Sequence, residues 1–269
     1  MFPLLVFLDF MALIMSKLPE ENQFLDLSDY GRPFARYIAE ALKNTSFTPI
    51  HVTLSFVIAG ILAIICLLNG YYWATAFFLI LKSILDAADG ELARVKNTPS
   101  YTGRYLDSVS DIILNLLIML AIWHVTERSI IYTSIAFISL QLQGTLYNYY
   151  YVILRNKHQG DTTSRIFENT TPIALKGEKQ KHVTLLFKLY KFFYGYFDAI
   201  IYKLDTNAAK SKLLPNWFMT AVSTFGLGFQ LLIIAIMLVL NLKEFIIPFF
   251  SFYSIFIIIF ISIRKYINL

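Results

Sequence analysis

Six stretches of the chain are long and almost wholly apolar, and most polar residues lie between them. A helix needs ~20 residues to cross the hydrocarbon core of a bilayer. The stretches therefore predict six transmembrane helices, at 50–69, 71–93, 107–125, 129–154, 216–240 and 244–263. The expected fold class is an all-α integral membrane protein.

The first two stretches are separated only by Asn69 and Gly70. This dipeptide is typical of tight turns, so the first two helices should form an antiparallel hairpin. Residues 1–16 are also apolar, but they contain Asp9 and lack the basic start of a signal peptide. They are either an interfacial segment or the result of an upstream start codon chosen in place of Met15.

Two polar stretches have the pattern of amphipathic helices, which suits the cytoplasmic headgroup layer. The first, 181–204, has a polar face of Lys188, Lys191, Gly195, Asp198 and Tyr202 opposite an apolar face of Leu185, Leu189, Phe192, Phe193, Tyr196, Ile200 and Leu204. The second, 29–43, aligns Asp29, Arg32, Arg36, Glu40 and Lys43 on one stripe. Plain solvated cytosolic helices are the alternative for both.

These elements divide the chain into three parts. Residues 1–49 form an N-terminal segment with one amphipathic helix, and residues 264–269 form the C-terminus. Between them, residues 50–263 form a six-helix transmembrane domain that includes a cytoplasmic loop at 155–215.

Composition supports a membrane location. The chain is 57% hydrophobic and 15% charged, whereas soluble domains are ~25% charged. The single cysteine, Cys66, lies in an apolar run and excludes both a disulfide framework and a cysteine-based zinc site.

The basic residues are distributed unevenly between the two sides that six spans define. The side holding both termini and the loops 94–106 and 155–215 carries 20 of the 23 lysines and arginines. Basic loops remain cytoplasmic, so both termini and both large loops should face the cytoplasm. The net charge of +5 is then explained by topology and contact with anionic lipid, and nucleic-acid binding is not expected.

Four aspartates cluster near the predicted cytoplasmic ends of two apolar stretches. Asp86 and Asp89 are spaced i, i+3, and Asp107 and Asp111 are spaced i, i+4, so each pair shares one helical face. Acids at membrane depth are costly and usually functional. Because a short connection joins the two stretches, the two acidic faces can converge at one cytoplasmic mouth.

Four carboxylates at one mouth would repel one another in a low dielectric, so a cation is expected among them. Hard oxygen ligands favour Mg²⁺ or Mn²⁺. Two such ions would suit a displacement at phosphorus. Lys82 lies one turn before Asp86 on the same face; it either pairs with the acids or extends its ammonium toward the headgroups.

The acids belong to a longer pattern of eight fixed positions, and a chance match has a probability on the order of 10⁻¹⁰. The pattern resembles the complete signature of the CDP-alcohol phosphotransferases, also called CDP-alcohol phosphatidyltransferases. Its positions are Asp86, Asp89, Gly90, Ala93, Arg94, Gly103, Asp107 and Asp111. The resemblance covers residues 86–111 in detail and roughly 28–263 in layout.

The resemblance implies a role for each of these positions. Asp86, Asp89 and Asp107 would ligate two Mg²⁺ or Mn²⁺ ions, and Asp111 would be both a ligand and the catalytic base for the acceptor hydroxyl. The CDP site would be lined by Gly90, Ala93 and Gly103, with Arg94 holding the motif or the donor phosphates. The implied reaction is attack by an alcohol on the β-phosphorus of a CDP-alcohol, with release of CMP.

Three further residues are candidate substrate contacts. Thr53 is the last residue of a Thr-Pro-x-x-x-Thr pattern that begins at Thr48 and resembles the pattern before the first span in the family. Ile50 stands where many relatives have Asn. Arg104 and Arg155 lie at the cytoplasmic ends of their spans, where phosphate-accepting relatives bind the acceptor. Each of these arginines is also explained as a topology marker.

The expected function is phospholipid biosynthesis, with a CDP-linked donor, an alcohol acceptor, and a homodimer as family members commonly form. Six spans favour CDP-diacylglycerol as donor. The alternative is a choline- or ethanolamine-type enzyme with a CDP-headgroup donor and a lipid alcohol acceptor. An ion-coupled transporter is more distant, because the acids lie near one end of the spans and no inverted repeat is visible.

Overall fold

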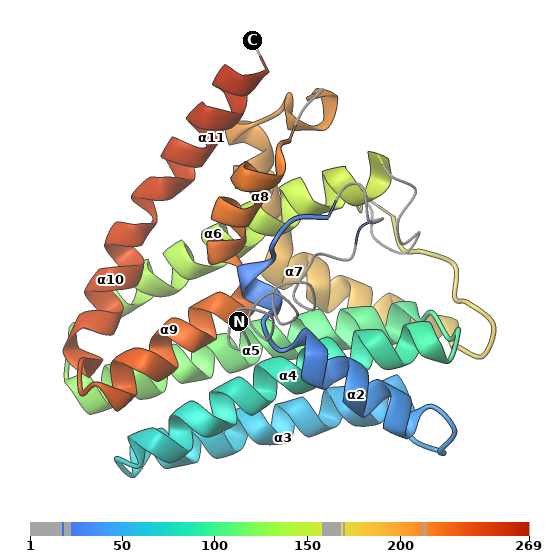
Figure 1. Cartoon of the computed structure of the whole chain (residues 1–269), viewed down its shortest axis with the longest axis horizontal. Helices are drawn as coiled ribbons and strands as arrows, with labels where there is room; N and C mark the ends of the chain where they lie inside the picture. Colours follow the sequence, from blue (N-terminus) through green and yellow to red (C-terminus); the bar gives the residue numbers. More distant parts are fainter. Residues whose placement is uncertain (1–17, 19–22, 158–167, 169, 212–213, 269) are drawn as a thin grey trace, which may run out of the picture.

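The computed structural model describes residues 18, 23–157, 168, 170–211 and 214–268, and these are mainly helical with no strand (Figure 1). Residues 1–16, whose nature the sequence leaves open, lie outside the described part. The helices are η2 (Leu27–Asp29), α2 (Arg32–Leu42), α3 (Pro49–Leu68), α4 (Tyr72–Val95), α5 (Tyr101–Thr126), α6 (Ile130–Lys157), α7 (Gln180–Leu204), η3 (Ala208–Lys210), α8 (Asn216–Val222), η4 (Ser223–Phe225), α9 (Leu227–Val239), η5 (Lys243–Phe245), α10 (Ile246–Tyr253) and α11 (Ile255–Ile267).

The predicted hairpin of α3 and α4 is confirmed. Pro49 occupies the first turn of α3, where its missing N–H is not needed, and the backbone N–H of Thr48 donates to Nδ1 of His51 at 3.0 Å. At the other end, Gly70 adopts a φ of +75°, a left-handed conformation that glycine tolerates. The chain therefore reverses within three residues and pairs α3 with α4 along their length.

Helix α5 begins six residues earlier than the apolar pattern indicates, at Tyr101 instead of 107. Ser100 caps it, because its Oγ accepts a hydrogen bond from the N–H of Gly103 at 2.8 Å. The helix therefore already contains Gly103 and Arg104, and only residues 96–100 connect α4 to α5. The expected short connection is confirmed, but its predicted bounds of 94–106 are wrong, because a cap can begin a helix in polar sequence.

Three helical segments of the described chain are long and apolar enough to cross a membrane: Pro49–Leu68, Tyr101–Thr126 and Lys243–Ile267. A fourth would be Asn216–Phe225 with Leu227–Val239, which bend by 55° at Gly226 and so are not the straight helix that 216–240 suggests. The remaining two predicted spans, α4 and α6, have the length but carry many polar residues. The protein is a helical membrane protein, and the count of six spans stays a prediction.

The two predicted amphipathic helices both form. Along α7 the apolar face is exposed, including Leu185, Phe192 and Tyr196, while Val183 and Phe187 pack inward. The other helix, α2, starts at Arg32 and not at 29, because Asp26 first caps a short 3-10 turn. Arg32 is also buried, against the expectation that it lies on an exposed stripe.

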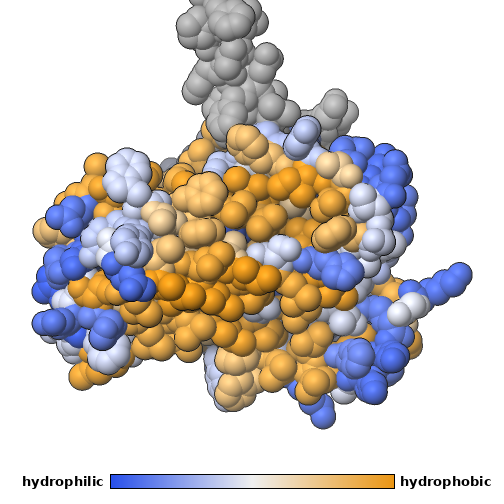
Figure 2. All heavy atoms as spheres, turned by 90° about the horizontal axis from the view of Figure 1, so that it is seen from below, coloured by the Kyte–Doolittle hydropathy of each residue, from blue (hydrophilic) through white to orange (hydrophobic). Residues whose placement is uncertain are grey.

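Helix α4 lies at the centre of the layer that positions the site, with α2, α3 and α9 packed against it and α5 beside α3 (Figure 1). Seen from the α3 side, an apolar surface spans the molecule and hydrophilic residues gather at its two ends (Figure 2). Exposed side chains of α3 contribute to this surface, among them Leu54, Ile58, Ile61 and Ile65. An apolar belt between two polar ends matches the solvent profile of a bilayer.

Candidate active site

A cavity of about 1330 Å³ opens beside the connection between α4 and α5. Its walls come from α3, α4, α5, α6, α7 and α9 and from residues 26–29. All eight motif residues that the sequence singles out line it, and so do Thr53, Arg104 and Arg155. The fold therefore gathers these candidates in one place, whereas Lys82 lies behind the wall.

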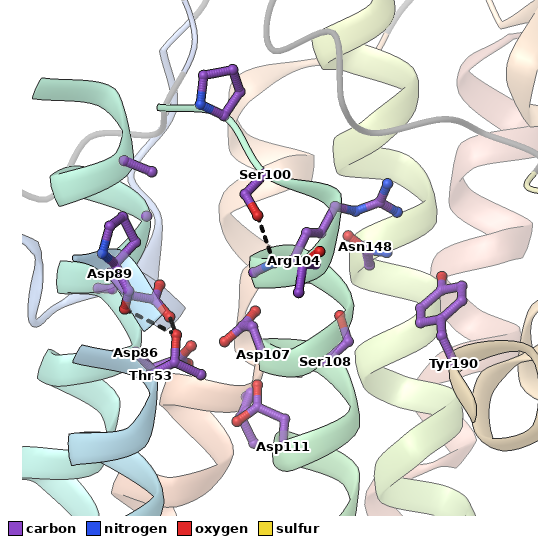
Figure 3. A pocket seen from close by; sticks show the side chains of 18 of the residues that line it. Thr53, Asp86, Asp89, Ser100, Arg104, Asp107, Ser108, Asp111, Asn148 and Tyr190 are labelled. Carbon is purple, nitrogen blue, oxygen red and sulfur yellow. Dashed lines mark hydrogen bonds between the residues drawn. The ribbon is translucent and has the colours of Figure 1, made fainter. Parts of the chain in front are cut away.

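Three aspartates converge on one point of this cavity. Asp86 and Asp89 extend from α4, and Asp107 extends from α5 toward them (Figure 3). Each offers a carboxylate oxygen, and the three oxygens lie within 4.8 Å of one another. The i, i+3 spacing on one helix and the facing residue on the next create this arrangement.

The arrangement fits a divalent cation. Oδ1 of Asp107 is buried and has no hydrogen-bond partner among the described residues. A buried carboxylate oxygen without a partner is unfavourable unless a cation or water contacts it. All the donors are hard oxygens, which suit Mg²⁺ and Mn²⁺ better than zinc or copper.

Two neighbouring side chains hold the acids in place. The hydroxyl of Thr53 on α3 donates to Oδ2 of Asp89 at 2.6 Å. The ammonium of Lys82 is fully buried, donates to Oδ1 of Asp111, and lies 3.9 Å from Oδ2 of Asp86. Lys82 therefore pairs with the acids and does not reach the headgroups.

The profile of the CDP-alcohol phosphatidyltransferase family matches residues 47–264, most of the chain. The chain belongs to this family. A comparison with individual curated proteins finds no match.

As a member of this family, the protein is a transferase of substituted phosphate groups. Enzymes of the family use a divalent metal, and the three convergent aspartates could hold such an ion. The donor is a CDP-alcohol and the acceptor an alcohol, in keeping with the fold of a membrane protein.

The small residues of the phosphatidyltransferase motif leave the donor side open. A Cβ added to Gly90 would meet only the guanidinium of Arg94, no closer than 3.7 Å, so the cavity reaches the backbone there. Ala93 lies one turn further along the same wall. Arg94 itself pairs with Glu91 at 2.7 Å. At Gly103 a Cβ would approach Oγ of Ser100 to 3.3 Å, which would crowd the cap of α5.

The two arginines named as acceptor contacts have different surroundings. Arg104 forms an ion pair with Glu168, whose other oxygen accepts a hydrogen bond from the hydroxyl of Tyr105 at 2.7 Å. Arg155 lies at the end of α6 with its guanidinium 5.8 Å from the centre of the Tyr151 ring. Sequence reasoning missed Glu168, because nothing in a loop sequence shows which helix a carboxylate will reach.

A second acid of the same loop binds the start of α5. Glu178 accepts hydrogen bonds from the N–H of Thr102 at 2.6 Å, from Oγ of Ser100 at 2.8 Å and from the N–H of Leu175 at 3.0 Å. Partial burial opposes its ionisation, but these hydrogen bonds outweigh it and hold the pKa of Glu178 below its ordinary value. The loop is thus fastened to the helix that carries Asp107 and Asp111.

The side of the cavity toward α6 carries polar residues that the sequence analysis did not single out. They are Ser108, Asn115, Gln141, Thr145 and Asn148, and Ser108 and Asn148 can be seen near Tyr190 in Figure 3. The last three are spaced i, i+4 and i+7 on one face of α6. A polar stripe at helical spacing inside an apolar stretch is the signal that could have found them.

Proposed function

We propose that this protein transfers a phosphatidyl group from CDP-diacylglycerol to the hydroxyl of a polar alcohol, releasing CMP, at the cytoplasmic face of a membrane. The observation that carries the proposal is the convergence of Asp86, Asp89 and Asp107 in one cavity, with Asp111 beside them on α5. The apolar belt and the excess of basic residues on one predicted side support the membrane setting and the orientation.

The acids divide into metal ligands and a base. Asp86, Asp89 and Asp107 would hold two Mg²⁺ or Mn²⁺ ions, with Asp111 as a further ligand. Such ions would supply charge that neutralises the diphosphate and stabilises the leaving phosphate. Asp111 accepts the proton of the acceptor hydroxyl, for which a positioned carboxylate is suited. The new bond joins the acceptor oxygen to the β-phosphorus, and the bond from that phosphorus to the oxygen of CMP breaks.

The neighbouring groups set the geometry of these steps. Lys82 fixes Asp111 through Oδ1, which leaves Oδ2 to face the acceptor hydroxyl. Thr53 fixes Asp89 in the same way. Gly90 and Ala93 leave room for the cytidine, and Arg94 and Gly103 complete that wall. Arg104 and Arg155 border the acceptor side.

The proposed topology has six spans, with α2 and α7 in the cytoplasmic headgroup layer. The exposed apolar face of α7 supports its contact with lipid. A homodimer, as is common in the family, completes the proposal. Neither feature is needed for the chemistry of a single site.

The proposal is tested by CMP release from the purified full-length protein in mild detergent with Mg²⁺ or Mn²⁺. CDP-diacylglycerol, CDP-choline and CDP-ethanolamine are each combined with polar and lipid alcohols. We expect release only with CDP-diacylglycerol and a polar alcohol. Release with a CDP-headgroup donor and a lipid alcohol would contradict the choice of donor.

The first variant is Asp111→Asn, which keeps the shape of the side chain and removes its basicity. General bases contribute ~10²–10⁴-fold to the rate, so kcat should fall by about that factor while metal-dependent binding of CDP remains. Glu127→Gln, at an exposed position between α5 and α6, is the matched control. Full activity of Asp111→Asn would exclude Asp111 as the base.

A further inference from the structure

The cavity extends past Asp111 into a part lined by uncharged side chains. Asn115 lies one turn beyond Asp111 on α5, away from the connection between α4 and α5. Helix α6 runs toward that connection and ends at Lys157, so Gln141 and Thr145 lie farther from the mouth than Asn148. This inner part offers amides and a hydroxyl to a bound molecule.

Two groups of this inner part have unused hydrogen-bonding capacity. The side-chain amide nitrogen of Gln141 and the hydroxyl of Thr145 find no partner among the described residues, although the two residues are only 5% and 7% exposed. Gln230 differs, because its amide donates to the carbonyl of Leu140 at 3.1 Å. Buried polar groups normally have partners, so the two unpaired groups indicate a ligand with hydrogen-bonding atoms.

Two features that could attract a phosphate are already matched by carboxylates. Arg104 is paired with Glu168, and the start of α5, where helix dipoles favour anions, is occupied by Glu178. Arg155 lies ten residues beyond Thr145, ~15 Å along the helix. A phosphate at Arg155 would lie toward the mouth of the cavity, whereas the unpaired groups lie farther inside.

We propose that the acceptor is an uncharged polyhydroxyl alcohol that hydrogen-bonds to Gln141 and Thr145 and presents one further hydroxyl to Asp111. This inference rests on the proposed function, since it names the acceptor class of the same site. A polyol satisfies both a donor and an acceptor without bringing charge into the low-dielectric interior. A phosphate monoester would bring an anion against uncharged side chains, which could not offset its loss of hydration.

The test compares polyols with their own phosphate esters. The full-length protein with Mg²⁺ and CDP-diacylglycerol is given myo-inositol or glycerol, each against its phosphate monoester, and serine. We expect kcat/KM for one of the polyols to exceed that of its ester at least tenfold. Preference for an ester, for serine or for a lipid alcohol would overturn the inference.

A variant then connects the preference to the unpaired groups. Thr145→Val keeps the shape of the side chain and removes the hydroxyl, and loss of one hydrogen bond should raise the KM for the polyol by about 2–10-fold. The KM for CDP-diacylglycerol should not change. Thr133→Val is the matched control, because Thr133 is also buried on α6 but bonds its own backbone and lies outside the cavity. Equal effects of the two variants would refute the assignment.

Glu168→Gln tests the role of the loop acid. It removes the charge that matches Arg104, so relative use of the phosphate esters should rise several-fold while use of the polyol persists. An unchanged ratio of polyol to ester would count against the electrostatic part of the inference.

The outcomes also distinguish a failure of this inference from a failure of the proposed function. Silence with every acceptor, while CDP still binds with metal, overturns the polyol acceptor and leaves the motif and donor site standing. Loss of metal-dependent CDP binding removes the proposed function and the inference together.

Discussion

The two sides of the cavity differ in both charge and origin. The side that we assign to the donor contains Asp86, Asp89 and Asp107, each with a carboxylate oxygen within 4.8 Å of the others. The side that we assign to the acceptor includes neutral groups such as Gln141 and Thr145. The donor residues come from two helices joined by a short connection, whereas the residues assigned to the acceptor lie on α5 and α6.

The difference indicates how enzymes with one shared mechanism can use different acceptors. Metal and diphosphate need fixed charges at fixed spacing, which a local motif supplies. An alcohol can be recognised by many neutral groups on any helix that reaches the cavity. The donor side should therefore respond strongly to loss of charge, and the acceptor side weakly to loss of single hydrogen bonds.

The largest effect is expected from Asp89→Asn, which removes charge from the convergent triad. Activity should fall by about 10³-fold or more, because metal stabilisation of the transferring phosphate is worth several kcal/mol. Chelation should abolish wild-type activity, and added Mg²⁺ or Mn²⁺ should restore the wild type but not the variant. Rates of CMP release measure both. Activity that survives chelation would show that the donor side does not depend on metal, and would contradict the contrast between the two sides.

Lys82→Met should have the next largest effect, because Lys82 is the buried cation between Asp86 and Asp111. Residues that orient metal-site groups usually change affinity or activity by ~10–100-fold, and we expect a loss of activity in that range. The variant leaves the acids without a built-in cation. Mg²⁺ should therefore raise its thermal midpoint more than that of the wild type, and an equal rise would contradict this role.

Two variants with smaller effects on activity would distinguish the donor side from the acceptor side most clearly. Thr53→Val removes the hydrogen bond to Asp89, so the Mg²⁺ concentration for half-maximal activity should rise by about tenfold with an unchanged KM for the acceptor. Thr145→Val should show the reverse, with a changed acceptor KM and an unchanged metal requirement. Metal and acceptor titrations of both variants measure this, and identical profiles would mean that the two sides act as one unit.

The elements of the fold were largely readable from the sequence. Apolar length located α3, α6 and the C-terminal helices to within a few residues, and the glycine turn predicted the hairpin. The early start of α5 was missed, because the Ser100 cap begins the helix in polar residues. The break at Gly226 was also missed, because hydropathy does not report on helix direction.

The acids were accessible to sequence reasoning because their spacing is local and their cost in a membrane is high. The loop acids were not, since the pairing of Glu168 with Arg104 joins residues 64 positions apart. The acceptor side was missed for a different reason. A glutamine or threonine in an apolar helix is compatible with ordinary helix packing, and only the cavity and its unpaired atoms distinguish Gln141 and Thr145.

The break before α9 places two glycines against the N-terminal part of the chain. A Cβ at Gly228 would lie 1.9 Å from the carbonyl oxygen of Ser28, and one at Gly226 would lie 2.2 Å from its Oγ. The N–H of Gly228 also donates to Oγ of Ser28 at 3.1 Å. Residues 27–29 therefore pack directly against the backbone at the start of α9. A larger residue at either glycine would push residues 27–29 away from α9, and these residues form part of the cavity wall.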